Sequence, residues 1–471
     1  MRRRACVIGS GPNGLAAAIV LAQAGLDVEV REAESVPGGG VRTLELTLPG
    51  FRHDFGSAVY PLAAGSPFFS SLPLAEQGLE WIHSPSVVAH PFDDGTAVLL
   101  DRDLRSAGAA LGEDGKKWDG LVRPFAENWN EFAPEALHPL PFLPRHPLLM
   151  ARFGALAIQS AAAIAERFRS TRTRALFAGV AAHSFLSLDE PLSGAFGVLM
   201  AVTAHAVGWP VARRGAQSIT NALVRVLESM LGKLITSARV ADIAALCGYD
   251  LFLCDVSTRN LVEIAENKLS RAYKLRLSKF RSGSGAFKID YALSSPVPWR
   301  ARECAQAATV HLGGTFEEIA EAEAAVRHGR CAERPFVLLC QPSLFDELRA
   351  PAGKHTLWVY CHVPNGSRVD MTERVEAQIE RFAPGFRDCI LARCVSSPAD
   401  LERRNANLIG GDVCGGIMDL RQFAFRPTSR QYATSAHNIY LCSSSTPPGA
   451  GVHGMCGYHA AKLALARLNR L

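Results

Sequence analysis

The sequence predicts an α/β protein with a glycine-rich βα unit at each end of the chain. At 5–24 an apolar strand, a glycine-rich turn and an alanine-rich helix follow one another, and a similar succession occurs at 439–467. The 471 residues are 48% apolar, which is enough to bury the cores of two to three domains.

Composition and charge exclude several classes of protein. Fifty Lys and Arg against 45 Asp and Glu give a net charge of +5, too small to indicate nucleic acid as a partner. The 12 cysteines form no CxxC pair and no Cys/His cluster with metal-ligand spacing. We therefore expect no metal, no disulfide scaffold and no dithiol reductase, but reduced thiols and a cytoplasmic location.

Two segments bear on membrane contact. Residues 191–212 contain no charged side chain, but their Ala and Gly content favours a buried helix over a transmembrane span. The basic run at 268–281 is typical of a solvated helix face, and the alternative is contact with an acidic surface or lipid headgroups. Peripheral membrane contact and a homodimer stay open.

The first glycine motif predicts a Rossmann-like dinucleotide-binding unit. Gly9 makes the turn after the strand, Gly11 lets the backbone approach a diphosphate, and Gly14 lets the helix pack on the strand. The helix N-terminus supplies N–H donors to phosphate. A second strand at 27–31 leads to Glu32, a carboxylate placed to bind ribose hydroxyls. The predicted cofactor contacts here are Gly9, Gly11, Pro12, Asn13, Gly14 and Glu32.

A second glycine cluster follows at 38–40. An extended FAD requires such a cluster because the chain must pass close to its diphosphate. In Gly38-Gly39-Gly40-Val41-Arg42 the sequence resembles the GR2-type flavoproteins, and the segment 53–57 is similar to their DxG turn. This resemblance adds Gly39, Gly40 and Arg42 to the predicted cofactor contacts; the alternative for Arg42 is an ordinary surface side chain.

The loop at 445–457 is the second informative segment. We expect a helix N-terminus near Gly451 and Val452, whose dipole would stabilise a negatively charged group. The segment resembles the C-terminal FAD motif of phytoene desaturase-like oxidoreductases, which include the pyridine nucleotide-disulfide oxidoreductase domain-containing protein 2 group. Ser443 and Ser444 depart from the glycines found in many relatives, which puts close backbone contact at that point in doubt.

The resemblance implies a non-covalent FAD and a discontinuous FAD-binding domain interleaved with an α+β substrate domain. It also implies a main-chain contact between Val240, on a strand expected at 234–243, and the adenine. The expected FAD-binding domain comprises 1–75, 214–285 and 425–471, and the substrate or cap domain comprises 76–213 and 286–424.

Lys288 and His453 are the candidate catalytic residues. Lys288 lies in an apolar strand at 286–293, and amine oxidases of the same superfamily place a strand lysine near flavin N5; the alternative is a lysine whose ammonium reaches solvent. His453 is expected either beside the flavin ring or capping the helix that follows. Trp299 is expected to pack in the core or to contact substrate.

The predicted function is that of an FAD-dependent oxidoreductase. A hydride would pass from a small lipophilic substrate to flavin N5, or the substrate would be isomerised there, with oxygen or a quinone as electron acceptor. No second GxGxxG pattern predicts a site for NAD(P)H. The alternatives are a flavin amine oxidase and a non-catalytic prenyl- or lipid-binding escort protein.

Overall fold

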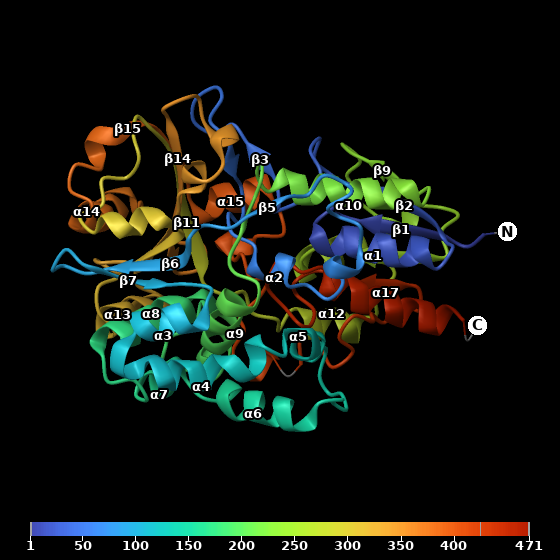
Figure 1. Ribbon diagram of the computed structural model, residues 1–471. Coiled ribbons are helices and arrows are strands. Elements are labelled where there is room, and N and C mark those ends of the chain that lie inside the picture. The colour runs from blue at the N-terminus through green and yellow to red at the C-terminus, as the bar shows by residue number, and fades with distance from the viewer. Residues whose placement is uncertain (1, 424, 470–471) are drawn as a thin grey trace.

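The computed structural model describes residues 2–423 and 425–469. It contains two large sheets, one toward each end of the molecule (Figure 1). The five-stranded sheet is wholly parallel and has the order β16-β10-β1-β2-β9. Its strands are β1 (Arg4–Ile8), β2 (Asp27–Arg31), β9 (Lys233–Ile235), β10 (Leu251–Cys254) and β16 (Ile439–Leu441).

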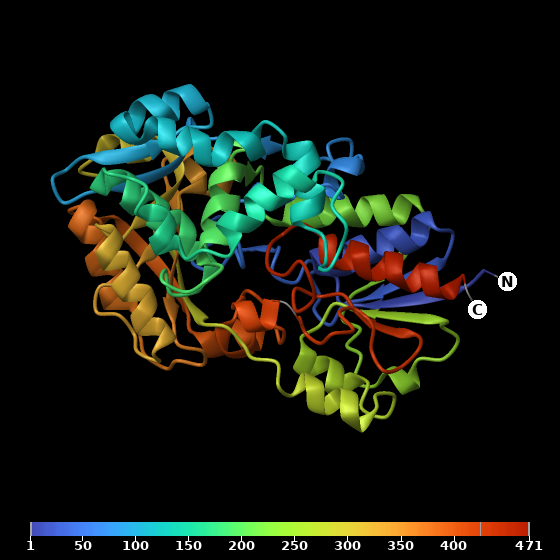
Figure 2. The same cartoon turned by 90° about the horizontal axis from the view of Figure 1, so that it is seen from below.

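Three helices cover one part of this sheet and bring the two ends of the chain together. Helix α1 (Pro12–Gln23) begins with proline at its first position and packs between α10 (Gln217–Ser229) and α17 (Met455–Leu468). A Cβ on Gly457 would lie 1.8 Å from the Asn13 carbonyl oxygen, so α17 can approach α1 this closely only with glycine there. Figure 2 shows α17, in red, beside the blue N-terminal segment.

The second sheet has seven strands in the order β15-β11-β14-β13-β12-β6-β7. All neighbours are antiparallel except β6 and β12. The strands are β6 (Ser86–Pro91), β7 (Ala97–Leu100), β11 (Gly285–Leu293), β12 (Ala307–Leu312), β13 (Val337–Cys340), β14 (His355–Val363) and β15 (Ile390–Ser396).

Successive side chains of β11 point to opposite faces of the seven-stranded sheet. Phe287, Ile289 and Tyr291 belong to the core beneath helix α14 (Thr372–Phe382). Lys288 therefore points to the opposite face, which is the face packed against the helical part of the substrate domain.

The predicted apolar cap is a layer of short helices. Helix α9 (Ser193–Ala206) lies inside it, so the uncharged stretch at 191–212 forms a buried helix as expected. Among the described residues, no helix is both long and apolar enough to cross a bilayer. The helices of this layer are α3 (Leu104–Ala110), α4 (Gly115–Ala126), α5 (Trp129–Ala136), α6 (Pro147–Ala157), α7 (Ala161–Ala165) and α8 (Thr171–Ala181).

The remaining elements connect these layers. The short strands are β3 (Thr43–Leu44) paired with β4 (His53–Asp54), and β5 (Trp81–Ile82) paired with β8 (Val211–Ala212). The other helices are α2 (Pro61–Ala64), α11 (Thr258–Ile264), α12 (Arg271–Leu277), α13 (Phe316–Arg327), α15 (Pro398–Arg404) and α16 (Leu420–Phe423).

The mixed α/β architecture agrees with the predicted fold class. The strands of the two sheets come from different ranges of the chain. Every strand of the parallel sheet lies within 1–75, 214–285 or 425–471. Every strand of the seven-stranded sheet lies within 76–213 or 286–424, except that β11 already begins at Gly285.

One strand is much shorter than expected. The strand predicted at 234–243 ends at Ile235, because β9 is the edge of its sheet and the chain turns away at Ser237, whose φ is +52°. Val240 therefore lies in an irregular segment rather than in a strand.

Candidate functional site

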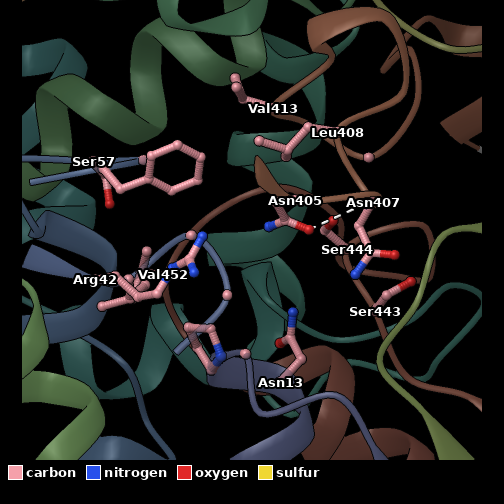
Figure 3. Close-up of a pocket in the computed structure, with 18 of the residues that line it drawn as sticks. Asn13, Arg42, Ser57, Asn405, Asn407, Leu408, Val413, Ser443, Ser444 and Val452 are labelled. Carbon is pink, nitrogen blue, oxygen red and sulfur yellow. Dashed lines mark hydrogen bonds between the residues drawn. The ribbon is translucent and has the colours of Figure 1, made fainter. Parts of the chain in front are cut away.

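A cavity of about 450 Å³ is lined by residues of both large sheets. Figure 3 shows Asn13, Arg42 and Asn405 around it, each from a different segment of the chain. All the predicted cofactor-binding residues except Gly14 line this one cavity: Gly9, Gly11, Pro12, Asn13, Glu32, Gly39, Gly40, Arg42, Val240, Gly451 and Val452. Cofactor binding by these residues stays a prediction.

The glycine turn after β1 is too crowded for side chains. A Cβ on Gly11 would lie 2.5 Å from an Asp255 carboxylate oxygen, and one on Gly14 would lie 2.1 Å from the Gly9 carbonyl oxygen. Gly14 is thus a packing residue behind the cavity, and its N–H donates to Asp255 Oδ2 at 2.9 Å. Pro12 has no N–H and the Gly14 N–H is taken by Asp255, so the first turn of α1 offers an anion at the cavity wall the Asn13 N–H and the positive end of the helix dipole.

Glu32 is fixed at the cavity by two backbone donors. It ends β2, is 7% exposed, and accepts hydrogen bonds from the N–H groups of Ser10 at 2.9 Å and Glu34 at 3.0 Å. The Ser10 hydroxyl also donates to Glu32 Oε2 at 2.5 Å, so Oε2 accepts two hydrogen bonds and Oε1 accepts one. Oε1 keeps a lone pair for a further donor such as a ribose hydroxyl.

The two glycine clusters of the N-terminal region touch each other. A Cβ on Gly39, whose φ is +58°, would lie 3.3 Å from Gly11 Cα. Arg42 follows and is 6% exposed, so it is not the surface side chain of the alternative interpretation. Its guanidinium lies over the Phe55 ring, 4.9 Å from the centroid, and its Nε has no hydrogen-bond partner among the described residues.

The C-terminal loop lines the cavity, but its helix begins later than expected. Gly451 and Val452 are at the cavity wall, whereas α17 begins at Met455, because Gly454 adopts the left-handed conformation at the N-cap. His453 Nδ1 accepts a hydrogen bond from the Met455 N–H at 3.0 Å, and burial lowers the pKa of its imidazole to about 4. His453 is therefore a neutral helix cap and does not line the cavity.

Lys288 does reach the cavity. It is 3% exposed, its ammonium is paired with the buried Asp290 carboxylate, and its Nζ lies 5.7 Å from the centroid of the Trp358 ring. Burial lowers the pKa of Lys288 and raises the pKa of Asp290. The alternative of a lysine whose ammonium reaches solvent is therefore wrong.

Trp299 takes the packing role rather than the substrate role. Its indole N–H donates to Gln341 Oε1 at 3.2 Å, and its ring belongs to the core beneath α14, away from the cavity. The aromatic side chains beside Lys288 are instead Trp358 and Tyr360 of β14, with ring centroids 5.1 Å apart and ring planes at 68°.

Two parts of the site were missed in the sequence. Asp255 directly follows β10 and lines the cavity, and burial raises the pKa of its carboxyl to about 7. Its position at the carboxyl end of an apolar strand was a usable indication. The segment 404–408 of the substrate domain also lines the cavity, and Asn407 Oδ1 accepts a hydrogen bond from the Ser257 N–H at 2.8 Å.

These features define a two-domain oxidoreductase with a Rossmann-like dinucleotide-binding unit. Residues 7–70 match the family described as NAD(P)-binding Rossmann-like domain. Pyridine nucleotide-disulfide oxidoreductase domain-containing protein 2 of Rattus norvegicus is 25% identical, over 99% of this chain and 94% of the relative. The lycopene-forming phytoene desaturase of Pantoea ananas is 24% identical, over 96% of both chains. The predicted relationship is thus confirmed along nearly the whole chain.

Solved structures agree on the fold. An oxidoreductase from Methanosarcina mazei has a TM-score of 0.66 at 17% identity, covering 98% of this chain and 100% of the other. Cyclohexylamine oxidase from Brevibacterium oxydans has a TM-score of 0.58 at 15% identity and full coverage of both chains. The predicted Rossmann-like architecture with a second domain is confirmed.

Proposed function

We propose that this protein is an FAD-dependent oxidoreductase that takes a hydride from a lipophilic substrate. One observation carries the proposal. A single cavity runs from the glycine turn and Glu32, which fit a dinucleotide, to a buried lysine and aromatic side chains of the second sheet. A nucleotide held at the first end would place its reactive part at the second.

The residues present fit FAD. Gly11 and Gly39 form a cradle that a Cβ would fill, and the buried Asn13 Oδ1 and Arg42 Nε lack partners within the described chain. Glu32 would hold the ribose, the glycine turn and the start of α1 would hold the diphosphate, and Val452 and Lys288 would adjoin the ring system. The bound flavin would supply the hydride acceptor, and we expect it to be non-covalent.

The substrate end of the cavity favours an apolar ligand. Its wall combines side chains of α9 with side chains of β13 and β14, and most of them are apolar or aromatic. A dry pocket of this kind orients an apolar molecule and excludes water from the reacting carbon. The residues concerned are Phe196, Met200, Leu338, Trp358 and Tyr360.

Lys288 is the side chain best placed to take part in the chemistry. Burial lowers the pKa of Lys288, which favours release of a proton from Nζ, and Asp290 holds the ammonium in place. It would orient a water molecule at the reacting centre or take up the proton that the substrate loses beside the hydride. We propose oxygen or a quinone as the acceptor that completes the cycle.

A second candidate function is amine oxidation. The pair of Trp358 and Tyr360 beside Lys288 supplies two aromatic faces, on which an amine substrate could pack. The likeness of the fold to cyclohexylamine oxidase supports the same candidate.

The flavin spectrum of the purified protein tests the proposal, followed by anaerobic reduction with isoprenoid or polyene compounds in one series and amines in another. We expect bound FAD that is bleached by a lipophilic compound. Bleaching by amines alone would favour the second candidate. A colourless protein that FAD does not reconstitute would exclude both and favour the non-catalytic lipid-binding alternative.

A further inference from the structure

Arg42 and Arg404 bring two positive charges together at the cavity from different domains. Arg42 follows the second glycine cluster, whereas Arg404 ends α15 of the substrate domain. Arg42 Nη2 donates to the Arg404 carbonyl oxygen at 3.1 Å, and both side chains line the cavity. Burial lowers the pKa of Arg42; the charges of Glu34 and Glu32 act against this, and the charge of Arg404 acts with it.

Each of the two guanidinium groups has N–H donors that no acceptor of the described chain satisfies. Among the described residues, the Arg42 side chain donates a hydrogen bond only to that carbonyl oxygen, and Arg404 Nη2 donates to the Cys394 sulfur at 3.8 Å. Arg42 Nε and Arg404 Nη1 are buried and have no partner in the part of the chain that the structure describes. Two neighbouring cations with buried free N–H groups are costly unless an anion lies between them.

The position of the pair identifies the anion. Asn405, the residue after Arg404, brings its Nδ2 to 3.9 Å from where a Cβ on Gly39 would lie. The same Cβ position is 3.3 Å from Gly11 Cα, in the turn whose backbone is open to a diphosphate. Segment 404–408 therefore lies against the diphosphate end of the cavity, and Asn407 holds it to the start of α11 through Ser257.

We infer that Arg404 of the substrate domain joins Arg42, already a predicted cofactor contact, in an anion site for the cofactor diphosphate. This inference rests on the proposed function. Guanidinium groups bind phosphate oxygens through charge-assisted hydrogen bonds. The cofactor would thus be held by both domains, and the substrate domain would contribute directly to cofactor affinity.

The test compares Arg404→Gln and Arg42→Gln with Arg403→Gln. Arg403 is the matched control because it is the preceding residue of the same helix, its side chain is 70% exposed, and it pairs with Asp400 outside the cavity. The FAD dissociation constant of each apoprotein is measured by flavin fluorescence, and ADP is titrated as a competitor. Thermal unfolding without ligand checks that each variant is folded.

Loss of one charge-assisted contact should weaken FAD binding by about 10- to 100-fold in each of the two variants. The affinity for ADP should fall by a similar factor. Arg403→Gln should bind both ligands as tightly as the wild type does. Unchanged FAD affinity in a folded Arg404→Gln protein would overturn the inference. So would weaker FAD binding with unchanged ADP binding, because the arginine would then contact another part of FAD. Failure of the wild type to bind FAD would instead overturn the proposed function itself.

Discussion

Gly11 controls how closely a ligand can approach the turn after β1. A side chain there would collide with the Asp255 carboxylate, whose oxygen lies 2.5 Å from the position of the added Cβ. We expect Gly11→Val to abolish FAD retention, because the displaced carboxylate or valine would occupy the diphosphate end of the cavity. Flavin absorbance of the purified variant measures this. Gly120→Val, at an open position of α4, should keep the flavin. Wild-type absorbance in Gly11→Val would contradict the assignment.

Substitution of Lys288 affects both the proposed reaction and the stability of the protein. Lys288→Met removes a group that can hold a proton at the cavity, and we expect flavin reduction or reoxidation to slow by about 100-fold. The change also leaves Asp290 buried without its cation, so Lys288→Met with Asp290→Asn is the better-folded comparison.

Stopped-flow absorbance measures both half-reactions of these variants. Lys279→Met, a substitution of an exposed lysine, is the control and should leave both rates unchanged. Wild-type rates in Lys288→Met would show that this lysine takes no part in the reaction.

At the scale of single elements, the start of α17 depends on His453. Its Nδ1 accepts the N–H of Met455 deep in the core, so His453→Ala should destabilise the protein by at least about 1 kcal/mol. His453→Asn keeps a hydrogen-bond acceptor and should destabilise the protein less than His453→Ala does. Because His453 does not line the cavity, the flavin spectrum should be unchanged in both variants. Denaturant unfolding and the visible spectrum check this; an altered spectrum with full stability would restore the ring-contact interpretation.

Elements with a regular pattern were predictable, whereas edge elements were not. Strand β2 occupies 27–31 as expected, because its alternating residues face the core on one side. Strand β9 is shorter than predicted because an edge strand pairs on one side only and a turn at Ser237 ends it. The start of α17 moved to Met455 because Gly454 supplies the left-handed cap, which glycines at 449 and 451 could equally have supplied.

At the scale of the whole molecule, the convergence of both chain ends could be predicted, but the contribution of the substrate domain could not. The glycine motifs carry a local pattern that specifies a close backbone approach, and the family resemblance implies that they meet at one ligand. Segment 404–408 carries no such pattern. Its place at the cavity depends on long-range contacts such as Asn407 with Ser257 and Arg42 with the Arg404 carbonyl.

Buried histidines throughout the molecule make its stability depend on pH. Burial lowers the pKa of His90 to about 4, of His183 to about 3 and of His453 to about 4. Below about pH 6.5 the unfolded chain binds protons at these groups while the folded chain does not, so stability falls as pH decreases toward 4. Asp255, whose pKa burial raises to about 7, acts in the opposite direction, and so do Asp290, Glu376 and Asp412. These four carboxyls stand against nine histidines of the described chain whose pKa values are lowered.

We therefore expect the free energy of unfolding to fall steeply between pH 6.5 and 4, by up to about 3 kcal/mol for each fully buried histidine. His90 donates from Nε2 to the Gly314 carbonyl oxygen at 2.7 Å, a bond that a glutamine amide can replace. His90→Gln should reduce the slope of unfolding free energy against pH by about one proton over this range, whereas the exposed His328→Gln should not. Urea unfolding at a series of pH values measures the slopes, and equal slopes in wild type and His90→Gln would show that His90 is protonated in the folded state.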